Sequence, residues 1–350
     1  MSGLLLVILV ILTYVILFQI AKSSEIIAQI QGEEAYDKKR NNYLSYTMLG
    51  LLAIIFIGAY YCHKYLMPMM LPKAASNHGE QYDWLYDVTT ILTLVVFFGT
   101  HILLFIFAYI YRRKEGKVPF HFAHNNKLEV VWTTIPALTL AVLIGLGLKT
   151  WFTMTSDAPK GSMRIEIIGK QFNWITRYPG KDGVLGKRYF TNINEKDNIL
   201  GLDWDDQKTH DDIVIPNGEL HLVKGKPVEL IIGSRDVVHD VGLPHFRMKM
   251  DAVPGITSRM WFTPTITTEE MKQITGNPDF VYEISCDQMC GKGHYSMRGV
   301  VIVETQAEYD SWLRKQQSYY SQRSVAVNND NESIIKSSFS DNKLSLNTKK

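Results

Sequence analysis

The sequence predicts a transmembrane α-helical anchor followed by an all-β domain. Two observations carry this prediction: apolar runs long enough to span a bilayer lie before residue 152, and short β-type runs alternate with turn formers from Met163 onward. A third observation concerns chemistry, because cysteine, histidine and methionine side chains crowd into the single stretch 286–297. The chain has 350 residues, which is enough for more than one domain.

The first two apolar runs form an N-terminal extension, residues 1–71. Leu4–Ile20 is almost wholly apolar and just long enough to span a bilayer. We expect a retained anchor, because no Lys or Arg precedes this run and no clean small-x-small cleavage pattern follows it; a cleaved signal peptide is the alternative. Residues 48–70 form a second candidate span, with Lys64 close enough to one end for its amine to reach the interface.

The third and fourth apolar runs, 88–111 and 130–148, form a helical hairpin within residues 85–152. The fourth run is entered through Glu129 and Trp132, and Pro136 is expected in its first turns, where a helix tolerates proline best.

Basic residues set the expected topology of these spans. They are concentrated in the loops 21–46 and 112–127 and are sparse in 71–87. The positive-inside rule therefore places the first two loops in the cytoplasm. Everything after Trp151 then lies on the outer face of a bacterial inner (plasma) membrane, in the periplasm of a Gram-negative cell.

The second half of the chain reads as a series of short strands. Turns separate these strands, for example at Pro216-Asn217-Gly218 and Val253-Pro254-Gly255. Many short strands separated by turns predict a sandwich or a barrel. The expected strands are Arg164–Ile168, Ile213–Ile215, Val228–Gly233, Arg259–Thr263, Phe280–Ser285 and Gly299–Glu304.

The stretch from Cys286 to Met297 has the composition of a copper site. Thiolate, imidazole and thioether ligands together suit copper, and two cysteines allow both sulfurs to bridge a pair of ions. A second imidazole is available upstream, at His239 or His245. The alternatives are a structural disulfide, a zinc site, which has no use for a thioether, and a purely packing role for Met297.

The pattern Cys-x-x-x-Cys-x-x-x-His-x-x-Met resembles the binuclear copper (CuA) loop of cytochrome c oxidase subunit II. The Glu-x-x-Trp-Thr-x-x-Pro entry of the fourth span resembles the same family, and the Ser-x-Asp-Val-x-His pattern selects His239 over His245. The resemblance implies a cupredoxin-like Greek-key sandwich over 160–305, with the copper loop between its last two strands. The implied metal ligands are Cys286 and Cys290 as bridges, His239 and His294 on one copper each, and Met297 and the carbonyl of Gln288 as weak ligands.

The resemblance also assigns roles to residues outside the loop. Phe172 stands where an exposed tryptophan often serves as electron entry, and Trp174 keeps a second aromatic position; core packing is the alternative for both rings. Glu129 matches a glutamate at the entrance of a proton-uptake path, or is an interfacial carboxylate at a helix N-terminus. Many relatives have a glutamate at Gln288 that reaches a magnesium ion, so no magnesium ligand is expected from this side chain.

By this resemblance, the chain is the electron-entry subunit of a respiratory oxidase that reduces oxygen to water and translocates protons. Its cofactor is a pair of copper ions. The resemblance places haem only in the partner subunit I. The sequence has no Cys-x-x-Cys-His motif, so no c-type haem is expected on this chain and the electron donor is expected to be a separate protein. The expected partners are subunit I and other oxidase subunits, cytochrome c or a complex bearing a c-type haem, and membrane lipid. A formal net charge of +2 argues against nucleic acid. The alternatives are a copper-less quinol oxidase subunit II and another membrane-anchored copper protein.

The resemblance covers roughly residues 85–305, and two further segments, one inside this range and one after it, have distinctive compositions. The insertion 180–212 carries an acidic run at 203–212, which is either a solvated loop or a surface that steers a basic electron donor. The tail 318–350 is rich in Ser, Asn and Lys and is expected to be disordered.

Overall fold

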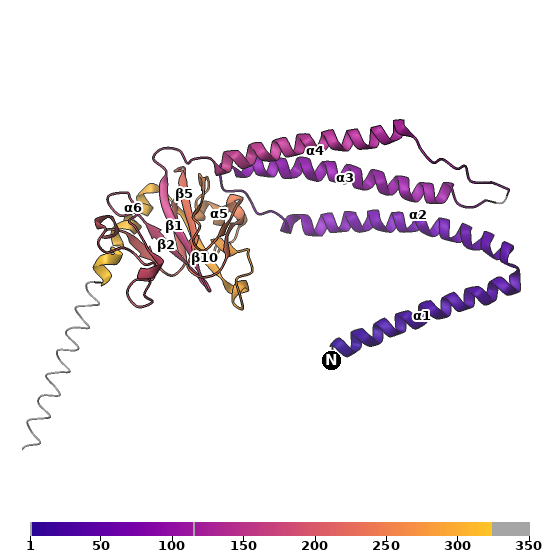
Figure 1. Cartoon of the computed structure of the whole chain (residues 1–350), viewed down its shortest axis with the longest axis horizontal. Helices are drawn as coiled ribbons and strands as arrows, with labels where there is room; N and C mark the ends of the chain where they lie inside the picture. Colours follow the sequence, from indigo (N-terminus) through magenta and orange to yellow (C-terminus); the bar gives the residue numbers. More distant parts are fainter. Residues whose placement is uncertain (1, 115, 324–350) are drawn as a thin grey trace, which may run out of the picture. The chain divides into compact units, whose positions relative to one another are not determined.

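The computed structural model describes residues 2–114 and 116–323 and divides into two compact units (Figure 1). The first unit comprises residues 1–70 and 88–139, and the second comprises 71–87 and 140–350. The first is helical and the second holds every β-strand of the described chain. The predicted fold class, a helical anchor followed by an all-β domain, is confirmed.

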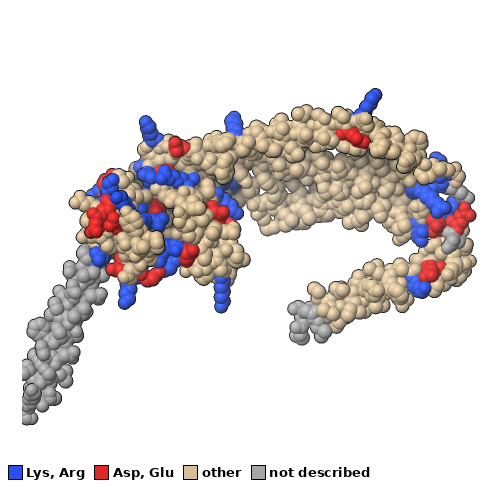
Figure 2. All heavy atoms as spheres, in the orientation of Figure 1, with Lys and Arg blue, Asp and Glu red and all other residues tan. Residues whose placement is uncertain are grey.

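Four helices are long and apolar enough to cross a membrane: α1 (Ser2–Gln31), α2 (Glu33–Leu66), α3 (Gly79–Ile110) and α4 (Asn126–Thr155). Figure 2 shows few charged side chains along their visible lengths. Within the first unit, α2 contacts α3 through the rings of Phe56 and Phe98, whose centroids lie 4.9 Å apart.

The helices extend further than the apolar runs that predict them. The charged stretch after Ile20 is helical, because its Ala, Lys, Glu and Gln residues are good helix formers. Helical structure is interrupted only at Gly32, between α1 and α2, where φ is 82°. Likewise α4 begins at Asn126, so Pro136 lies in the helix interior and not in its first turns.

The second unit is a sandwich of two five-stranded sheets. One sheet has the order β3-β2-β1-β5-β8 and the other β4-β10-β9-β6-β7; β1 pairs with β5 and β4 with β10 in parallel, and the other neighbours are antiparallel. The strands are β1 (Met163–Lys170), β2 (Asn173–Tyr178), β3 (Ile213–Ile215), β4 (Glu219–Val223), β5 (Val228–Ser234), β6 (His239–Leu243), β7 (Met248–Ala252), β8 (Ser258–Phe262), β9 (Tyr282–Cys286) and β10 (Arg298–Glu304).

The core lies between the two sheets. Its largest fully buried side chains include Trp174, Tyr178, Phe246, Phe262 and Tyr282. Burying a side chain of this size stabilises the fold by about 1.5–3 kcal/mol each. Two short helices, α5 (Thr268–Thr275) and α6 (Gln306–Lys315), each begin with a capping box in which a threonine and a glutamate exchange hydrogen bonds.

The polar segment before α3 belongs to the second unit. The backbone N–H of Ala75 donates to the carbonyl of His245 at 2.7 Å, and the hydroxyl of Ser76 donates to the carbonyl of Phe246 at 2.7 Å. Arg247 forms an ion pair with Asp83 at 2.6 Å. What the sequence presents as a polar link is therefore packed against the sandwich.

The insertion between β2 and β3 folds onto the same unit. Its buried Asp212 pairs with Arg177 of β2 at 3.1 Å, and Tyr319 donates its backbone N–H to the carbonyl of Asp212 at 2.8 Å. The predicted tail 318–350 lies outside the described residues except for 318–323, and the Tyr319 contact shows that the packed chain extends into those six residues.

Candidate metal centre

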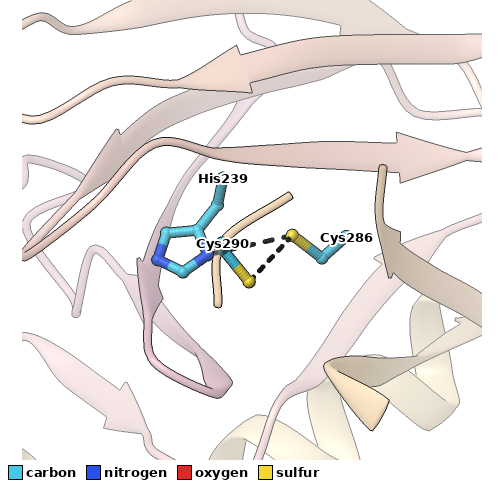
Figure 3. A group of neighbouring side chains, drawn as sticks. All are labelled: His239, Cys286 and Cys290. Carbon is cyan, nitrogen blue, oxygen red and sulfur yellow. Dashed lines mark hydrogen bonds between the residues drawn. The ribbon is translucent and has the colours of Figure 1, made fainter. Parts of the chain in front are cut away.

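Two neighbouring strands bring the predicted metal ligands together. His239 is the first residue of β6 and Cys286 the last of β9, and these strands pair antiparallel with Val241 opposite Cys286. The remaining candidates lie in the loop from β9 to β10. Figure 3 shows the imidazole of His239 and the thiols of Cys286 and Cys290 gathered at one point.

The donor atoms form a connected cluster. The sulfurs of Cys286 and Cys290 lie 3.7 Å apart. Nδ1 of His239 lies 3.8 Å from the first sulfur, and Nδ1 of His294 lies 3.7 Å from the second. The thioether sulfur of Met297 is 3.8 Å from the Cys290 sulfur, and the carbonyl oxygen of Gln288 is 3.3 Å from the Cys286 sulfur.

The sulfurs are not joined in a disulfide, and they are close enough to share one metal ion. A disulfide needs about 2.05 Å between sulfurs, and both cysteines are free. Sulfurs 3.7 Å apart lie within reach of one ion held at about 2.3 Å from each, the distance usual for a zinc–thiolate bond. His239, Cys286, Cys290 and Met297 are all buried, so the centre is shielded from water.

Asp236 fixes the orientation of the His239 ring. Its Oδ1 lies 2.8 Å from Nε2 of His239, so a proton on Nε2 leaves the lone pair of Nδ1 facing the sulfurs. The carboxylate also accepts the backbone N–H groups of Gln171 and Val237, each at 2.7 Å. Burial opposes ionisation of Asp236, but these hydrogen bonds outweigh it and lower its pKa. A carboxylate that orients a histidine in this way is typical of metal sites.

The thiol of Cys290 favours its protonated form when no metal is bound. Burial, reinforced by the adjacent Cys286 thiol, raises the pKa of Cys290 above its usual range. Binding a metal must therefore displace the proton of Cys290, which couples metal uptake to pH.

The segment around Phe172 lies directly on the metal-binding loop. The side-chain amide of Gln171 donates to the carbonyl of Cys290 at 2.6 Å. A Cβ added at Gly293 would lie 2.6 Å from Cγ and Cδ2 of Phe172, and one at Gly291 would lie 3.2 Å from the same ring. The two glycines therefore allow the Phe172 ring to pack closely against the loop.

The other predicted functional residues have different surroundings. Trp174 is fully buried, and its ring centroid is 6.0 Å from that of His239. Glu129 lies in the other unit, exposed in the first turn of α4. His245 packs against the rings of Phe280 and Tyr282, with centroids 5.2 Å apart in each case. Within the described residues, His239 and not His245 lies beside the sulfurs.

Sequence reasoning missed the supporting roles of Asp236 and Gln171. Asp236 stands inside the Ser-x-Asp-Val-x-His pattern, and its spacing three residues before His239 was the available signal. The bond from Gln171 to the Cys290 carbonyl joins residues 119 positions apart, so no local pattern predicts it.

Two family models match the chain, one for each part of it. Residues 62–149 match the transmembrane domain of cytochrome c oxidase subunit II, and residues 163–305 match its periplasmic domain. The chain is thus a membrane-anchored protein with a periplasmic domain. The first match covers apolar helices, and the second covers the sandwich. Helix α1 and most of α2 precede the matched region.

Individual relatives carry the same description. The alternative cytochrome c oxidase subunit 2 of Bradyrhizobium diazoefficiens is 35% identical over 271 residues, which cover 77% of this chain and 91% of the relative. The cytochrome c oxidase subunit 2 of Thermostichus vulcanus is 27% identical over 71% of this chain and 79% of its own. Among solved structures, the periplasmic domain of subunit II of cytochrome oxidase of Bradyrhizobium japonicum aligns with 45% of this chain and 94% of that one, at 24% identity and a TM-score of 0.30.

Proposed function

Because the chain belongs to the cytochrome c oxidase subunit II family, we propose that it is the electron-entry subunit of a respiratory oxidase. It accepts electrons from cytochrome c, or from a complex that presents a c-type haem, at a binuclear copper centre (CuA). It passes them to haem in subunit I, where oxygen is reduced to water and protons are translocated.

The residues that would hold the two copper ions are those of the buried cluster. Cys286 and Cys290 would bridge the ions, His239 and His294 would each bind one through Nδ1, and Met297 and the Gln288 carbonyl would be weak ligands. Such a centre takes up and releases one electron with little change in its geometry. The paired strands β6 and β9 hold His239 and Cys286 in place. The loop that carries the other ligands packs against the Phe172 ring through Gly291 and Gly293.

One observation carries this proposal: two sulfurs 3.7 Å apart, each with an Nδ1 atom within 3.8 Å, and a thioether beside one of them. A single-copper site needs only one thiolate, and zinc has no use for the thioether. A quinol oxidase subunit II lacks copper and would have no need of this donor set.

Further roles follow from the position of the chain in the complex. Phe172, which is 39% exposed, would receive the electron, and the buried Trp174, whose ring centroid lies 6.0 Å from that of His239, would be a second aromatic position on the route. Glu129 would mark the entrance of a proton path into subunit I. The helices would hold the chain in the bacterial inner membrane against subunit I, other oxidase subunits and lipid.

Copper titration of the purified full-length chain tests the proposal. Under reducing conditions we expect two copper ions per chain and proton release on binding. The Cys290→Ser variant should lose this stoichiometry, whereas Cys62→Ser, which changes an exposed cysteine outside the cluster, should keep it. One copper per chain, or two that survive Cys290→Ser, would contradict a thiolate-bridged pair.

A further inference from the structure

The hairpin that carries the metal ligand His239 is fastened to the start of α3. Three consecutive residues of its turn, 245–247, all bond to the segment 72–83. Resting on the proposed function, we propose that Arg247 is a positioning residue for electron transfer out of the copper centre. Its guanidinium fixes this hairpin to the first turns of α3, and so holds the centre at a set distance from the haem of the partner subunit.

Arg247 uses its guanidinium almost fully in this contact. Nε and Nη2 donate to the two carboxylate oxygens of Asp83, at 2.6 and 3.0 Å, in the bidentate arrangement that fixes the direction of both partners. Nη2 also donates to the carbonyl of Pro72 and Nη1 to that of Pro244, each at 2.6 Å. The Arg247 side chain is only 3% exposed, so water competes little for these donors.

The backbone conformation of Arg247 separates the role of its side chain from that of the turn. Its φ of 55° and ψ of 38° lie in the left-handed region, where any residue with a Cβ is strained and glycine is not. Within the described residues, no other non-glycine residue has a positive φ. A glycine would therefore suit the turn better, and the four hydrogen bonds of the guanidinium are what offsets the strain of an arginine here.

Strand β6 connects this contact to the metal centre. It runs from His239 to Leu243 and pairs with β7 along its whole length, so the ligand and the turn at 244–247 are the two ends of one paired ribbon. Every residue of β6 is buried, and close packing of this kind lets the hairpin move only together with its neighbours. A displacement of the turn is therefore passed on to the ligand cluster.

Asp83 connects the same contact to the membrane anchor. It lies in the second turn of α3, which continues as one helix to Ile110. Because the rate of electron tunnelling falls steeply with distance, a small displacement of the sandwich relative to the start of α3 changes the rate at which the centre delivers its electron. A lysine at position 247 would keep the charge but not the planar fork that fixes this geometry.

Single-electron injection into the purified oxidase complex tests the inference. A photoexcited ruthenium complex, which is a small reductant, reduces the copper centre, and absorbance then follows the passage of the electron to the haem. Arg247→Gln should slow this passage by about ten-fold or more, since a misplacement of about 1 Å can cost about 100-fold. The injection rate, the copper content and the copper resonance spectrum should stay as in the wild type.

Four further variants show whether the ion pair itself is responsible. Arg247→Gly should slow the passage as Arg247→Gln does, although it relieves the backbone. Asp83→Asn should slow it as well, and adding it to Arg247→Gln should slow the passage no further, because both changes break one contact. Arg164→Gln is the matched control, since it removes an ion pair at 2.9 Å, to Glu229, without touching residues 71–87. It should leave the passage rate unchanged.

The possible results separate this inference from the proposed function. Passage at the wild-type rate in both Arg247→Gln and Asp83→Asn would overturn the inference and leave the proposed function standing. Loss of the copper signal, or an equal slowing of the injection step, would also overturn it, because Arg247 would then support the centre itself and not its position. Absence of a reducible copper centre from the wild-type complex would overturn the proposed function, and this inference with it.

Discussion

The Gly293→Ala substitution adds one methyl group to the copper loop and so tests how tightly that loop is packed. The φ of Gly293, −94°, is open to any residue, so the alanine variant carries no backbone penalty. Its Cβ would meet Cγ and Cδ2 of Phe172 at 2.6 Å, about 1 Å inside an ordinary carbon–carbon contact. Rotating the ring about χ2 does not move Cγ, so either the whole ring leaves or the loop shifts.

We therefore expect Gly293→Ala to destabilise the copper-loaded chain by about 1–3 kcal/mol, the usual cost of overpacking. Phe172→Ala in the same chain removes the obstacle, so the double variant should recover most of this loss. Denaturant unfolding, followed by loss of the copper–thiolate absorption, gives the four free energies of unfolding in this cycle.

Gly291 provides the matched control. Its Cβ would also meet the Phe172 ring, at 3.2 Å, but its φ of 132° strains any other residue. Phe172→Ala should therefore fail to rescue Gly291→Ala. A coupling energy below about 0.5 kcal/mol between Gly293 and Phe172 would refute the packing argument, because contacting residues normally exceed that value.

Three further predictions concern the residues that support the sandwich and its metal site. Asp236→Asn should lower copper affinity by about 10–100-fold in a competition titration, because the amide no longer fixes the His239 tautomer; unchanged affinity would remove Asp236 from the site. Arg177→Ala should cost about 3–5 kcal/mol in denaturant unfolding, since it leaves the buried Asp212 without a cation and Glu166 paired with Arg188 alone, and a loss below about 1 kcal/mol would contradict this. Burial, then the charge of Arg247, lowers the pKa of His245 from 6.5 to about 4, so its contribution to stability is present above pH 6.5 and is lost as the pH falls toward 4. His245→Gln should abolish the loss of stability that protonation of His245 causes, which is at most about 3 kcal/mol. The measurement is the thermal midpoint as a function of pH, and a profile that the substitution leaves unchanged would show that His245 is solvated.

Local patterns in the sequence predicted the fold class, which is confirmed. The residues that gather around the two sulfurs were named from the resemblance to the family, and their role as metal ligands stays a prediction. Strands β5 and β10 each contain a run of consecutive aliphatic residues, which is a local strand signal, and the spacing of the two cysteines marks the loop. Strands β2, β4, β6 and β7 were not predicted, since polar or charged residues interrupt them: β6 reads His-Asp-Val-Gly-Leu yet is buried throughout. Its burial comes from the neighbouring strands and not from its own composition.

Contacts between distant segments could not be predicted from the sequence for a related reason. The bond from Gln171 to Cys290, the seat of Phe172 on Gly293 and the packing of residues 71–78 on the sandwich all join residues far apart in the chain. Each is set by the sheet order, and local periodicity carries no information about it. The same holds for the acidic insertion, whose aspartates become loop acceptors only once the loop is folded.

Electron paramagnetic resonance of the oxidised, copper-loaded full-length chain tests the central claim most directly. The bridged arrangement of Cys286 and Cys290 predicts a seven-line hyperfine pattern, from one unpaired electron shared equally by two copper nuclei. A four-line pattern, from an electron confined to one copper, would contradict the bridging thiolates and with them the proposed electron-entry centre.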